Sequence, residues 1–434
     1  MSKSLKSFFL IVFSMGILLG CSHEQPPSEV AISASPSDTT LSHSTGKPIT
    51  GLYPLQDFGG FVYGAAGEDG FYSISSTRAD GSTNIQYTDY ETMESIPLCS
   101  QINCTHDSDV CTSWLPYNGG GTSLMTVGEQ LILAAPGQPN LYENLGDLCL
   151  PNIRVCALDG SNRKLLVQFS SEQRLLTPYL TDGEFLYVTL QTLTEESVQN
   201  ELIQIDLSSG DYFPVEELNN EHIESVIGAS GEYIFFNQIS DTSQEAQLQM
   251  NYTVDIYQYN VNTAKKELVA KCPIDTCRRA LFQNTLVTYD RNMNCLTLFD
   301  CVENKQQAVI SFVLPNNLTA MDVNLIYYDA PYLLISYPNV TEGGQEGLRC
   351  YQTVNFSTQE ICDFERCYSV GDRLLPDFPI AHIDEQYYFV VDGEEEIPQS
   401  LINNEGATYY LSTTAFQYGK IKKSDYWTGQ NTSQ

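Results

Sequence analysis

The chain has 434 residues, of which 54 are acidic and 21 basic, giving a formal net charge of −33. This length exceeds what a single hydrophobic core usually organises, so we expect several domains or one repeat array. A hydrophobic fraction of 42% excludes global disorder, and the negative charge excludes nucleic acid as a partner because phosphate backbones would repel it.

Residues 1–21 have the pattern of a secretory signal peptide. Lys3 and Lys6 precede an apolar run over residues 8–19, and the segment ends in Leu-Leu-Gly-Cys21. The run is too short to span a bilayer comfortably. Leu-x-Gly-Cys at this place resembles the lipobox of bacterial lipoproteins, which implies that the Cys21 thiol carries acyl chains such as palmitate. Two acyl chains would anchor the protein to the extracellular face of the bacterial cell membrane. An ordinary signal peptide cleaved elsewhere is the alternative.

Residues 22–50 are rich in Ser, Thr and Pro and show no apolar periodicity. This composition predicts a flexible linker between the anchor and the folded part. The folded part is expected over residues 51–424, followed by a C-terminal tail over residues 425–434.

A polar turn followed by a short aromatic or β-branched strand recurs from residue 51 onward, most clearly at Thr181–Val188. The copies align at intervals of 46 to 60 residues on Phe71, Leu131, Phe185, Tyr233, Leu286, Tyr332 and Tyr387. A period near this length, built from strands, is typical of β-propeller blades. The sequence therefore predicts an all-β propeller with seven blades, six or eight being the alternatives, in which the recurring strand is the innermost of each blade. A β-solenoid is disfavoured because its coils are much shorter.

The unit that follows Asp182 shows the expected order within a blade. The strand at Leu202–Leu207, the turn at Ser208–Asp211 and the strand at Tyr212–Val215 predict a hairpin with Gly in its turn. For closure of the ring, we expect an N-terminal strand such as Phe61–Tyr63 to pair with the final strands, Thr408–Ser412 and Phe416–Ile421.

The 13 cysteines leave an even number, 12, once Cys21 is lipidated, and disulfides are the default expectation for an exported protein. Three pairs share the spacing C-x4-C and follow the last strand of a unit: Cys99 with Cys104, Cys272 with Cys277, and Cys362 with Cys367. Two further pairs are close enough in sequence to bridge locally: Cys149 with Cys156, and Cys295 with Cys301. Cys111 and Cys350 share no spacing with the rest.

The densest cysteine cluster reads C-x4-C-x-H-x4-C and consists of Cys99, Cys104, His106 and Cys111. Three thiols and one imidazole could hold a structural zinc ion in tetrahedral geometry. The spacing matches neither C-x2-C zinc ribbons nor plant-type iron–sulfur sites. Disulfides, a structural metal and free thiols in an anaerobic habitat therefore remain as three alternatives.

This cluster, placed after the first blade of a lipobox-bearing propeller, resembles a group of surface lipoproteins of Gram-positive anaerobes. Their fold is similar to TolB-type and other irregular β-propellers. The resemblance covers the lipobox, the cluster and the repeat, whereas the later C-x4-C pairs depart from the family pattern. It implies a fold and a location, and no particular activity.

Motifs for catalysis are absent from the sequence: it holds no H-E-x-x-H, G-x-S-x-G, phosphate-binding loop or dinucleotide-binding glycine pattern. His382, with Asp384 and Glu385, is expected in a loop at a rim of the propeller, where ligands often bind; a solvated loop is the simpler alternative. We therefore predict a binding or scaffolding module for a protein, peptide or carbohydrate ligand. The alternatives are a hydrolase or lyase that uses carboxylates and His382 in the central channel, and a metal sensor or redox element at Cys99–Cys111.

Overall fold

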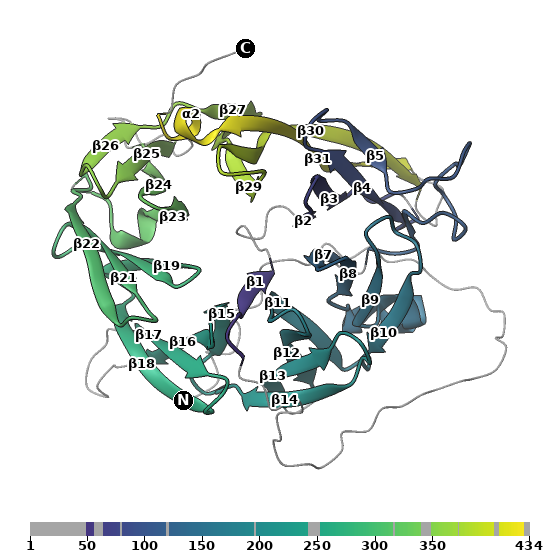
Figure 1. The fold of residues 1–434 in the computed structure, drawn as a ribbon, viewed down its shortest axis with the longest axis horizontal. Helices are drawn as coiled ribbons and strands as arrows, with labels where there is room; N and C mark the ends of the chain where they lie inside the picture. Colours follow the sequence, from purple (N-terminus) through teal and green to yellow (C-terminus); the bar gives the residue numbers. More distant parts are fainter. Residues whose placement is uncertain are drawn as a thin grey trace.

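The computed structural model describes residues 49–55, 64–78, 80–118, 121–194, 197–241, 252–315, 317–339, 349–371, 373–402 and 408–428. This part of the chain is almost entirely β-strand, and its sheets surround a common axis as the seven blades of a β-propeller (Figure 1). The predicted fold class is thereby confirmed. Cys21 and nearly all of the predicted linker lie outside the described residues. Within the described ranges, no helix is long and apolar enough to cross a membrane.

In the first four blades the antiparallel strands follow chain order from the axis outward. Blade 1 contains β2 (Gly64–Ala66), β3 (Gly70–Ile74), β4 (Thr83–Asp89) and β5 (Ser95–Pro97), with β6 (Trp114–Leu115) paired to β4. Blade 2 contains β7 (Ser123–Val127), β8 (Gln130–Ala135), β9 (Asn152–Ala157) and β10 (Lys164–Gln168). Blade 3 contains β11 (Gln173–Thr181), β12 (Phe185–Leu193), β13 (Val198–Asp206) and β14 (Tyr212–Glu217), with β1 (Tyr53–Leu55) on its inner edge. Blade 4 contains β15 (Glu224–Ser230), β16 (Tyr233–Asp241), β17 (Tyr252–Asn260) and β18 (Lys265–Pro273).

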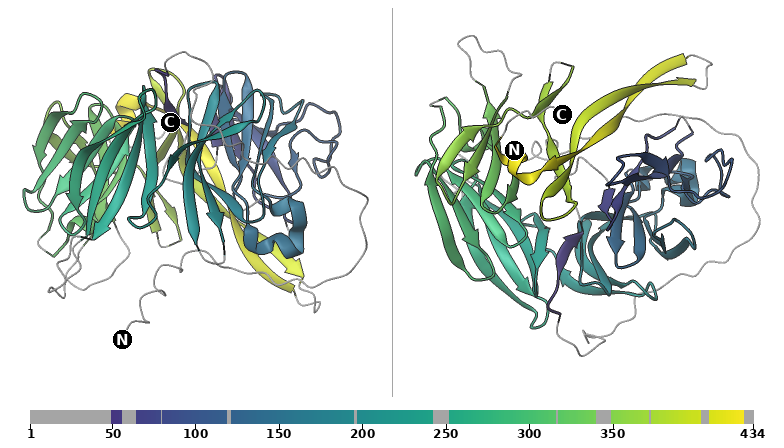
Figure 2. Two further views of the ribbon diagram at one scale, coloured as in Figure 1. Left: turned by 90° about the horizontal axis from the view of Figure 1, so that it is seen from below. Right: turned by 45° about the horizontal axis from the view of Figure 1, so that its top comes forward.

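Blades 5 and 6 keep this order, whereas blade 7 is irregular. Blade 5 contains β19 (Cys277–Phe282), β20 (Thr285–Asp290), β21 (Cys295–Asp300) and β22 (Lys305–Ser311). Blade 6 contains β23 (Asn324–Asp329), β24 (Tyr332–Pro338), β25 (Arg349–Asn355) and β26 (Glu360–Asp363). Blade 7 combines a hairpin of β27 (Cys367–Val370) and β28 (Arg373–Pro376) with a sheet of β29 (Phe378–His382), β30 (Tyr387–Ile402) and β31 (Thr408–Lys422). The long β30/β31 hairpin extends beyond the body of the ring (Figure 2).

The helical segments are short and lie in a connection within blade 2, before blade 6 and at the end of blade 7. They are η1 (Pro139–Leu141), α1 (Tyr142–Leu145) and η2 (Gly146–Cys149) within blade 2, η3 (Ala320–Asp322) before β23, and α2 (Lys423–Trp427) at the end of the described chain. The sequence pattern ends the propeller at residue 424, but α2 carries Tyr426 and Trp427 into the core between blades 6 and 7. The packed fold therefore extends into the predicted tail.

The hairpin predicted after Asp182 is present as β13 and β14. The Asp206 carboxylate accepts the backbone N–H groups of Ser208 and Ser209 at 2.7 and 3.2 Å, which closes the turn. Gly210 follows with a φ of 83°, a conformation that residues with a Cβ rarely adopt. Local turn chemistry thus sets this part of the blade, as the sequence indicates.

The recurring aromatic strand is the second strand of each blade, and its prediction as the innermost strand is wrong. The copy that begins at Phe185 is β12, which lies between β11 and β13. A second strand is paired on both edges and covered by neighbouring blades on both faces, so seven consecutive residues of β12 are buried. A strand buried on both faces has a continuous apolar run, and this run is the recurring pattern seen in the sequence.

Seven clusters of buried side chains form the core, one at each boundary between adjacent blades. Alternate residues of a strand serve the two boundaries on either side of it. In β12, Leu186 and Val188 pack toward blade 2, whereas Phe185 and Tyr187 pack toward blade 4. Each blade therefore buries apolar surface only against its two neighbours, which is why the array must close into a ring.

Blades 7 and 1 meet through aromatic packing. The ring of Phe71 in β3 lies 5.2 Å from that of Phe389 in β30, and Tyr418 of β31 stacks on Phe389 at 5.0 Å. In the described ranges, β31 pairs with β30 alone and includes both predicted final strands, Thr408–Ser412 and Phe416–Ile421. The predicted fastening strand Phe61–Tyr63 lies outside the described residues. The described N-terminal strand, β1, instead pairs with β11 in blade 3.

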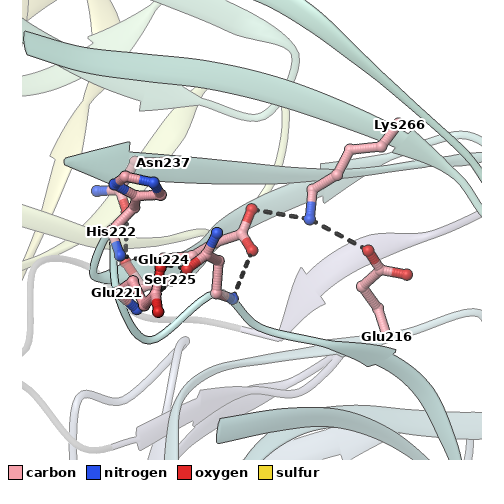
Figure 3. A network of polar contacts seen from close by, with 8 residues as sticks. Glu216, Glu221, His222, Glu224, Ser225, Asn237 and Lys266 are labelled. Atoms are coloured by element: carbon pink, nitrogen blue, oxygen red, sulfur yellow. Dashed lines mark hydrogen bonds and ion pairs between the residues drawn. The ribbon is translucent and has the colours of Figure 1, made fainter. Parts of the chain in front are cut away.

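A buried ion-pair network joins blades 3 and 4 (Figure 3). Lys266 Nζ of β18 lies 2.8 Å from Glu224 Oε1 of β15 and 3.2 Å from Glu216 Oε1 of β14. The Glu224 side chain is only 2% exposed, and its other oxygen accepts the backbone N–H of Asn219 at 2.9 Å. Lys266 also lies 4.5 Å above the ring of Phe236. This single ammonium group therefore compensates a carboxylate that water scarcely reaches.

Candidate metal centre

The predicted cysteine cluster lies in residues 98–113, the segment that connects β5 with β6 and leads from blade 1 toward blade 2. The segment contains no strand, and short turns set its shape. The Cys104 N–H is bonded to the Gln101 carbonyl at 3.4 Å, and the Cys111 N–H to the Ser108 carbonyl at 3.0 Å. Each turn therefore ends on a cysteine and directs the chain back toward Cys99.

Two residues of this loop adopt the left-handed backbone conformation. The φ of Asn103 is 61° and that of His106 is 56°. Asn and His are among the non-glycine residues that most often adopt this conformation. The backbone changes direction at Asn103, before Cys104, and again at His106, after it. These changes allow the side chains of a short segment to converge.

The loop brings its four predicted ligands together. The Sγ atoms of Cys99, Cys104 and Cys111 and a ring nitrogen of His106 all lie within 4.8 Å of one another. His106 Nδ1 is 3.2 Å from Cys111 Sγ. Zinc–sulfur bonds of about 2.3 Å at tetrahedral angles place sulfur atoms roughly 3.8 Å apart, so a metal ion fits this spacing. Four protein ligands leave no open position, which is typical of a structural rather than a catalytic centre.

Buried polar groups of blade 1 support the loop from behind. The His106 carbonyl accepts hydrogen bonds from Arg78 at 3.1 Å and from the Asn84 side chain at 3.0 Å. The Asn84 amide also donates to Ser113 Oγ at 2.9 Å, and that hydroxyl lies 3.1 Å from Cys111 Sγ. Asn84, Cys111 and Ser113 are each at most 3% exposed. This chain of contacts resembles the outer shell that orients ligands in metal sites.

The thiols in this cluster influence one another. Burial raises the pKa of Cys99, but hydrogen bonds from the Gln101 backbone and from the Cys111 and Cys104 side chains outweigh it and lower that pKa. The backbone hydrogen bond from His106 lowers the pKa of Cys104, yet burial and the thiols of Cys111 and Cys99 together raise it. Close thiolates repel each other, and a bound cation would remove that conflict.

The three C-x4-C pairs all lie where the outer strand of one blade leads toward the next, but their positions are not identical. Cys99 and Cys104 follow β5, whereas Cys272 and Cys362 lie within β18 and β26, and their partners begin β19 and β27. Among the three pairs, the first alone has a histidine and a third cysteine within metal-binding distance in the described part of the chain. Cys272 and Cys277 are buried, whereas Cys362 is exposed and Cys367 partly buried.

The other two predicted pairs are not brought together. Cys295 begins β21 and Cys301 follows its last residue, so they lie about 20 Å apart at roughly 3.3 Å per residue, well beyond the reach of a disulfide. Cys149 ends η2 with its thiol directed to the Gly146 carbonyl at 3.2 Å. Cys156 lies in β9, with its thiol 3.7 Å from the carbonyl of Leu131. Close spacing in sequence therefore does not bring these thiols into contact.

The predicted rim residues lie at the end of β29 and in the turn after it. His382 is exposed, lies 2.8 Å from Lys423 Nζ and 3.3 Å from the Tyr327 hydroxyl, and has a pKa lowered by desolvation and by Lys423. Asp384 accepts the backbone N–H groups that start β30, and Glu385 is exposed. The described groups around His382 are thus an amine, aromatic side chains and one carboxylate, Asp329, whose charge acts against the lowering of the His382 pKa. A hydrolase or lyase site in the channel would instead need several carboxylates around it.

Sequence reasoning missed the residues that support the metal loop. Arg78 and Asn84 precede Cys99, the first residue of the cluster, by 21 and 15 positions and form no motif with it. They reach His106 only because the loop between β3 and β4, which holds Arg78, and the start of β4, which holds Asn84, lie beside the segment after β5. No signal in the sequence marks this arrangement.

Comparison with known proteins finds no family model that matches the sequence and no matching curated protein. Among solved structures, an oligogalacturonate lyase in complex with manganese is 10% identical over 85% of this chain and 99% of its own, with a TM-score of 0.40. The β-propeller domain of the Trilobed protease from Pyrococcus furiosus is 11% identical over 86% and 99%, with a TM-score of 0.42. The acylaminoacyl peptidase of Pyrococcus horikoshii is 9% identical over 82% and 52%, with a TM-score of 0.43. These similarities assign no activity to this chain, so its function must be argued from its own residues.

Proposed function

We propose that this chain is an extracellular binding β-propeller, tethered to a bacterial membrane by lipid on Cys21, whose recognition loop at residues 98–113 is organised by a structural zinc ion. The observation that carries the proposal is the convergence of three thiols and one imidazole within 4.8 Å in a single loop. Thiolate and imidazole ligands in this number suit zinc better than calcium or magnesium, which take oxygen ligands.

The loop needs such a centre because it buries little apolar surface of its own. Ile102 and Val110 are 91% and 67% exposed and contribute nothing to a core. Their loop segments are joined by the hydrogen bond from the Gln101 side chain to the Val110 carbonyl at 2.9 Å. Metal bonds would supply the order that hydrophobic burial does not.

The same exposure favours recognition as the role of the loop. Binding residues commonly occupy loops that a rigid scaffold positions, and a metal-ordered loop would present Ile102 and Val110 without an ordering cost on binding. Exposed aliphatic side chains suit a protein or peptide ligand with an apolar surface better than a carbohydrate.

Metal content of the purified full-length chain tests the zinc centre. We expect one zinc ion per chain, lost in Cys104→Ser and His106→Gln. The matched control, Cys362→Ser, changes an exposed cysteine at an equivalent crossover and should retain the metal. An intact mass that shows a disulfide within the cluster, together with absence of zinc, would refute the centre and favour the disulfide alternative.

Anchoring and recognition need separate tests. Cys21→Ser should release the protein from membranes into the soluble fraction, and unchanged membrane association would contradict lipidation. A photo-crosslinking residue at position 102 should yield a discrete, zinc-dependent adduct on intact cells. The same residue at Val313, which is 69% exposed in the crossover after β22, should not. Equal labelling at both positions would argue against recognition by this loop.

A further inference from the structure

The crossover from blade 4 to blade 5 holds a second close pair of thiols. Cys272 is the penultimate residue of β18, Cys277 is the first residue of β19, and four residues separate them. The connecting turn is held at both ends, because the Ile274 N–H is bonded to the Tyr252 carbonyl at 3.0 Å and the Thr276 carbonyl accepts the Arg291 N–H at 2.8 Å. The two thiols lie close enough to shift each other's pKa, and the residues are 3% and 7% exposed.

The C-x4-C spacing alone does not explain why Cys272 and Cys277 lie close together. Cys362 and Cys367 have the same spacing at the crossover from blade 6 to blade 7, but Cys362 lies exposed on β26, opposite Thr353 of β25. The pKa of Cys367 is raised to about 12 by burial and by Asp377, with no contribution from Cys362. The turn between β18 and β19 therefore joins two buried cysteines that act on each other, whereas the turn after β26 joins an exposed cysteine to a partly buried one.

The surroundings of the buried pair differentiate its two thiols. The hydrogen bond with Cys277 and the charge of Arg279 lower the pKa of Cys272 despite burial. The hydrogen bond with Cys272, burial and nearby charges raise the pKa of Cys277. Each thiol thus acts on the other in the folded chain, which requires the two sulfur atoms to lie close together.

We propose that Cys272 and Cys277 form a disulfide when the chain folds in an oxidising compartment, and that this bond staples blade 4 to blade 5. The oxidant is a disulfide of a small thiol or of a thiol oxidase. The thiolate of one of the two cysteines attacks one of the oxidant's sulfur atoms, forming a mixed disulfide and releasing one thiolate. The other cysteine, once deprotonated, attacks the sulfur of the first and releases the second thiolate. The oxidant gains two electrons and, with the two protons from the cysteines, leaves as two thiols.

Burial dictates when this reaction occurs. Cys272 lies opposite Val254, which belongs to the buried core between blades 4 and 5. Thiols as little exposed as those of Cys272 and Cys277 are shielded from solution. The bond therefore forms before the two blades close on each other, and the native fold then protects it from reductants. This staple is independent of the proposed zinc centre, which lies at another crossover.

Tryptic mapping of the full-length chain tests the staple directly. Cleavage after Lys271 and after Arg278 places both cysteines on one seven-residue peptide, Cys272–Arg278. Chain exported to an oxidising compartment is denatured, alkylated without reductant and digested. We expect this peptide to be unalkylated and lighter by two hydrogens than the dithiol form. The same chain from a reducing cytosol should give a doubly alkylated peptide.

The matched control is the exposed pair at the other crossover. Arg366 separates Cys362 from Cys367, so trypsin places them on different peptides. The peptide Cys350–Arg366 contains Cys350 and Cys362 and should carry two alkyl groups, and the peptide Cys367–Arg373 should carry one. A doubly alkylated Cys272–Arg278 peptide from exported chain would overturn the proposal, as would a bond from either cysteine to another partner. Cys277→Ser should lower the thermal unfolding midpoint of the exported chain and leave that of the cytosolic chain nearly unchanged. A similar loss in both samples would show that the serine acts through packing alone.

Discussion

Replacement of Asn84 by leucine tests how blade 1 controls the metal loop. Asn84 is 3% exposed, and its amide donates to the His106 carbonyl at 3.0 Å and to Ser113 Oγ at 2.9 Å. Leucine has a similar volume, so the main loss is these two hydrogen bonds. His106 keeps its bond from Arg78, and Ser113 keeps its contact with Cys111. The loop should therefore stay near its position but hold its ligands less firmly.

The magnitude follows from the number of bonds to the loop that are lost. Asn84→Leu also removes the bond that Asn84 Oδ1 accepts from Arg78, but that bond does not reach the loop. At about 1 kcal/mol for each of the two bonds to the loop, the loss is about 2 kcal/mol, which corresponds to about 30-fold weaker metal binding. Removal of outer-shell partners in metal sites typically costs about 10- to 100-fold in affinity, so the two estimates agree. The assay is competition for zinc with a chromophoric chelator of known affinity, using Asn84→Leu and the unaltered chain.

A second asparagine provides the control. Asn118 also makes two side-chain hydrogen bonds, from the Thr122 N–H at 3.0 Å and to Thr77 Oγ1 at 3.3 Å, but it does not contact the metal loop. Asn118→Leu should leave zinc affinity within about twofold of the unaltered chain because only outer-shell partners tune a site. Equal zinc affinities for Asn84→Leu and Asn118→Leu would refute the role assigned to Asn84.

Two further predictions concern the boundaries between blades. Lys266→Met leaves the buried Glu224 carboxylate without its cation, and because Lys266 is 23% exposed we expect a loss of about 2–3 kcal/mol in the free energy of unfolding, somewhat below the range for fully buried pairs. Denaturant unfolding measures this loss, and the double variant Lys266→Met with Glu224→Gln should recover most of it; no recovery would show that the buried charge is not the cause. Phe389→Ala opens a cavity between blades 7 and 1 and should cost about 3–5 kcal/mol in the same assay. Phe213→Ala, at a residue 39% exposed on β14, should cost less than about 1 kcal/mol, and similar losses for both would contradict closure of the ring by aromatic packing.

The number of blades and their hairpins could be predicted because their signals are local. A turn such as Ser208–Asp211 depends on its own side chains and on one glycine, and the apolar run that begins at Phe185 reflects burial on both faces of a strand. The same signal led to the wrong position for that strand. An apolar run shows that both faces of a strand are covered by neighbouring blades, but it does not show which strand lies nearest the axis. The most apolar strand of a blade is the one that has a paired strand on each edge.

The cluster of Cys99, Cys104, His106 and Cys111 could be predicted only in part. Its four side chains lie within thirteen positions, so their spacing was visible in the sequence. The supporting residues Arg78 and Asn84 come from the loop before β4 and from β4 itself, and they were not visible.

The sequence by itself determined the repeat, the seven blades and the placement of the C-x4-C pairs at crossovers between blades, because each of these depends on residues close together in the chain. Only the tertiary structure decided which cysteines meet. Contact between Cys272 and Cys277 depends on a turn held by Tyr252 and Arg291, while the strand between Cys295 and Cys301 holds them apart. Distance in space is set by backbone direction and by hydrogen bonds from distant segments, which spacing along the chain does not encode.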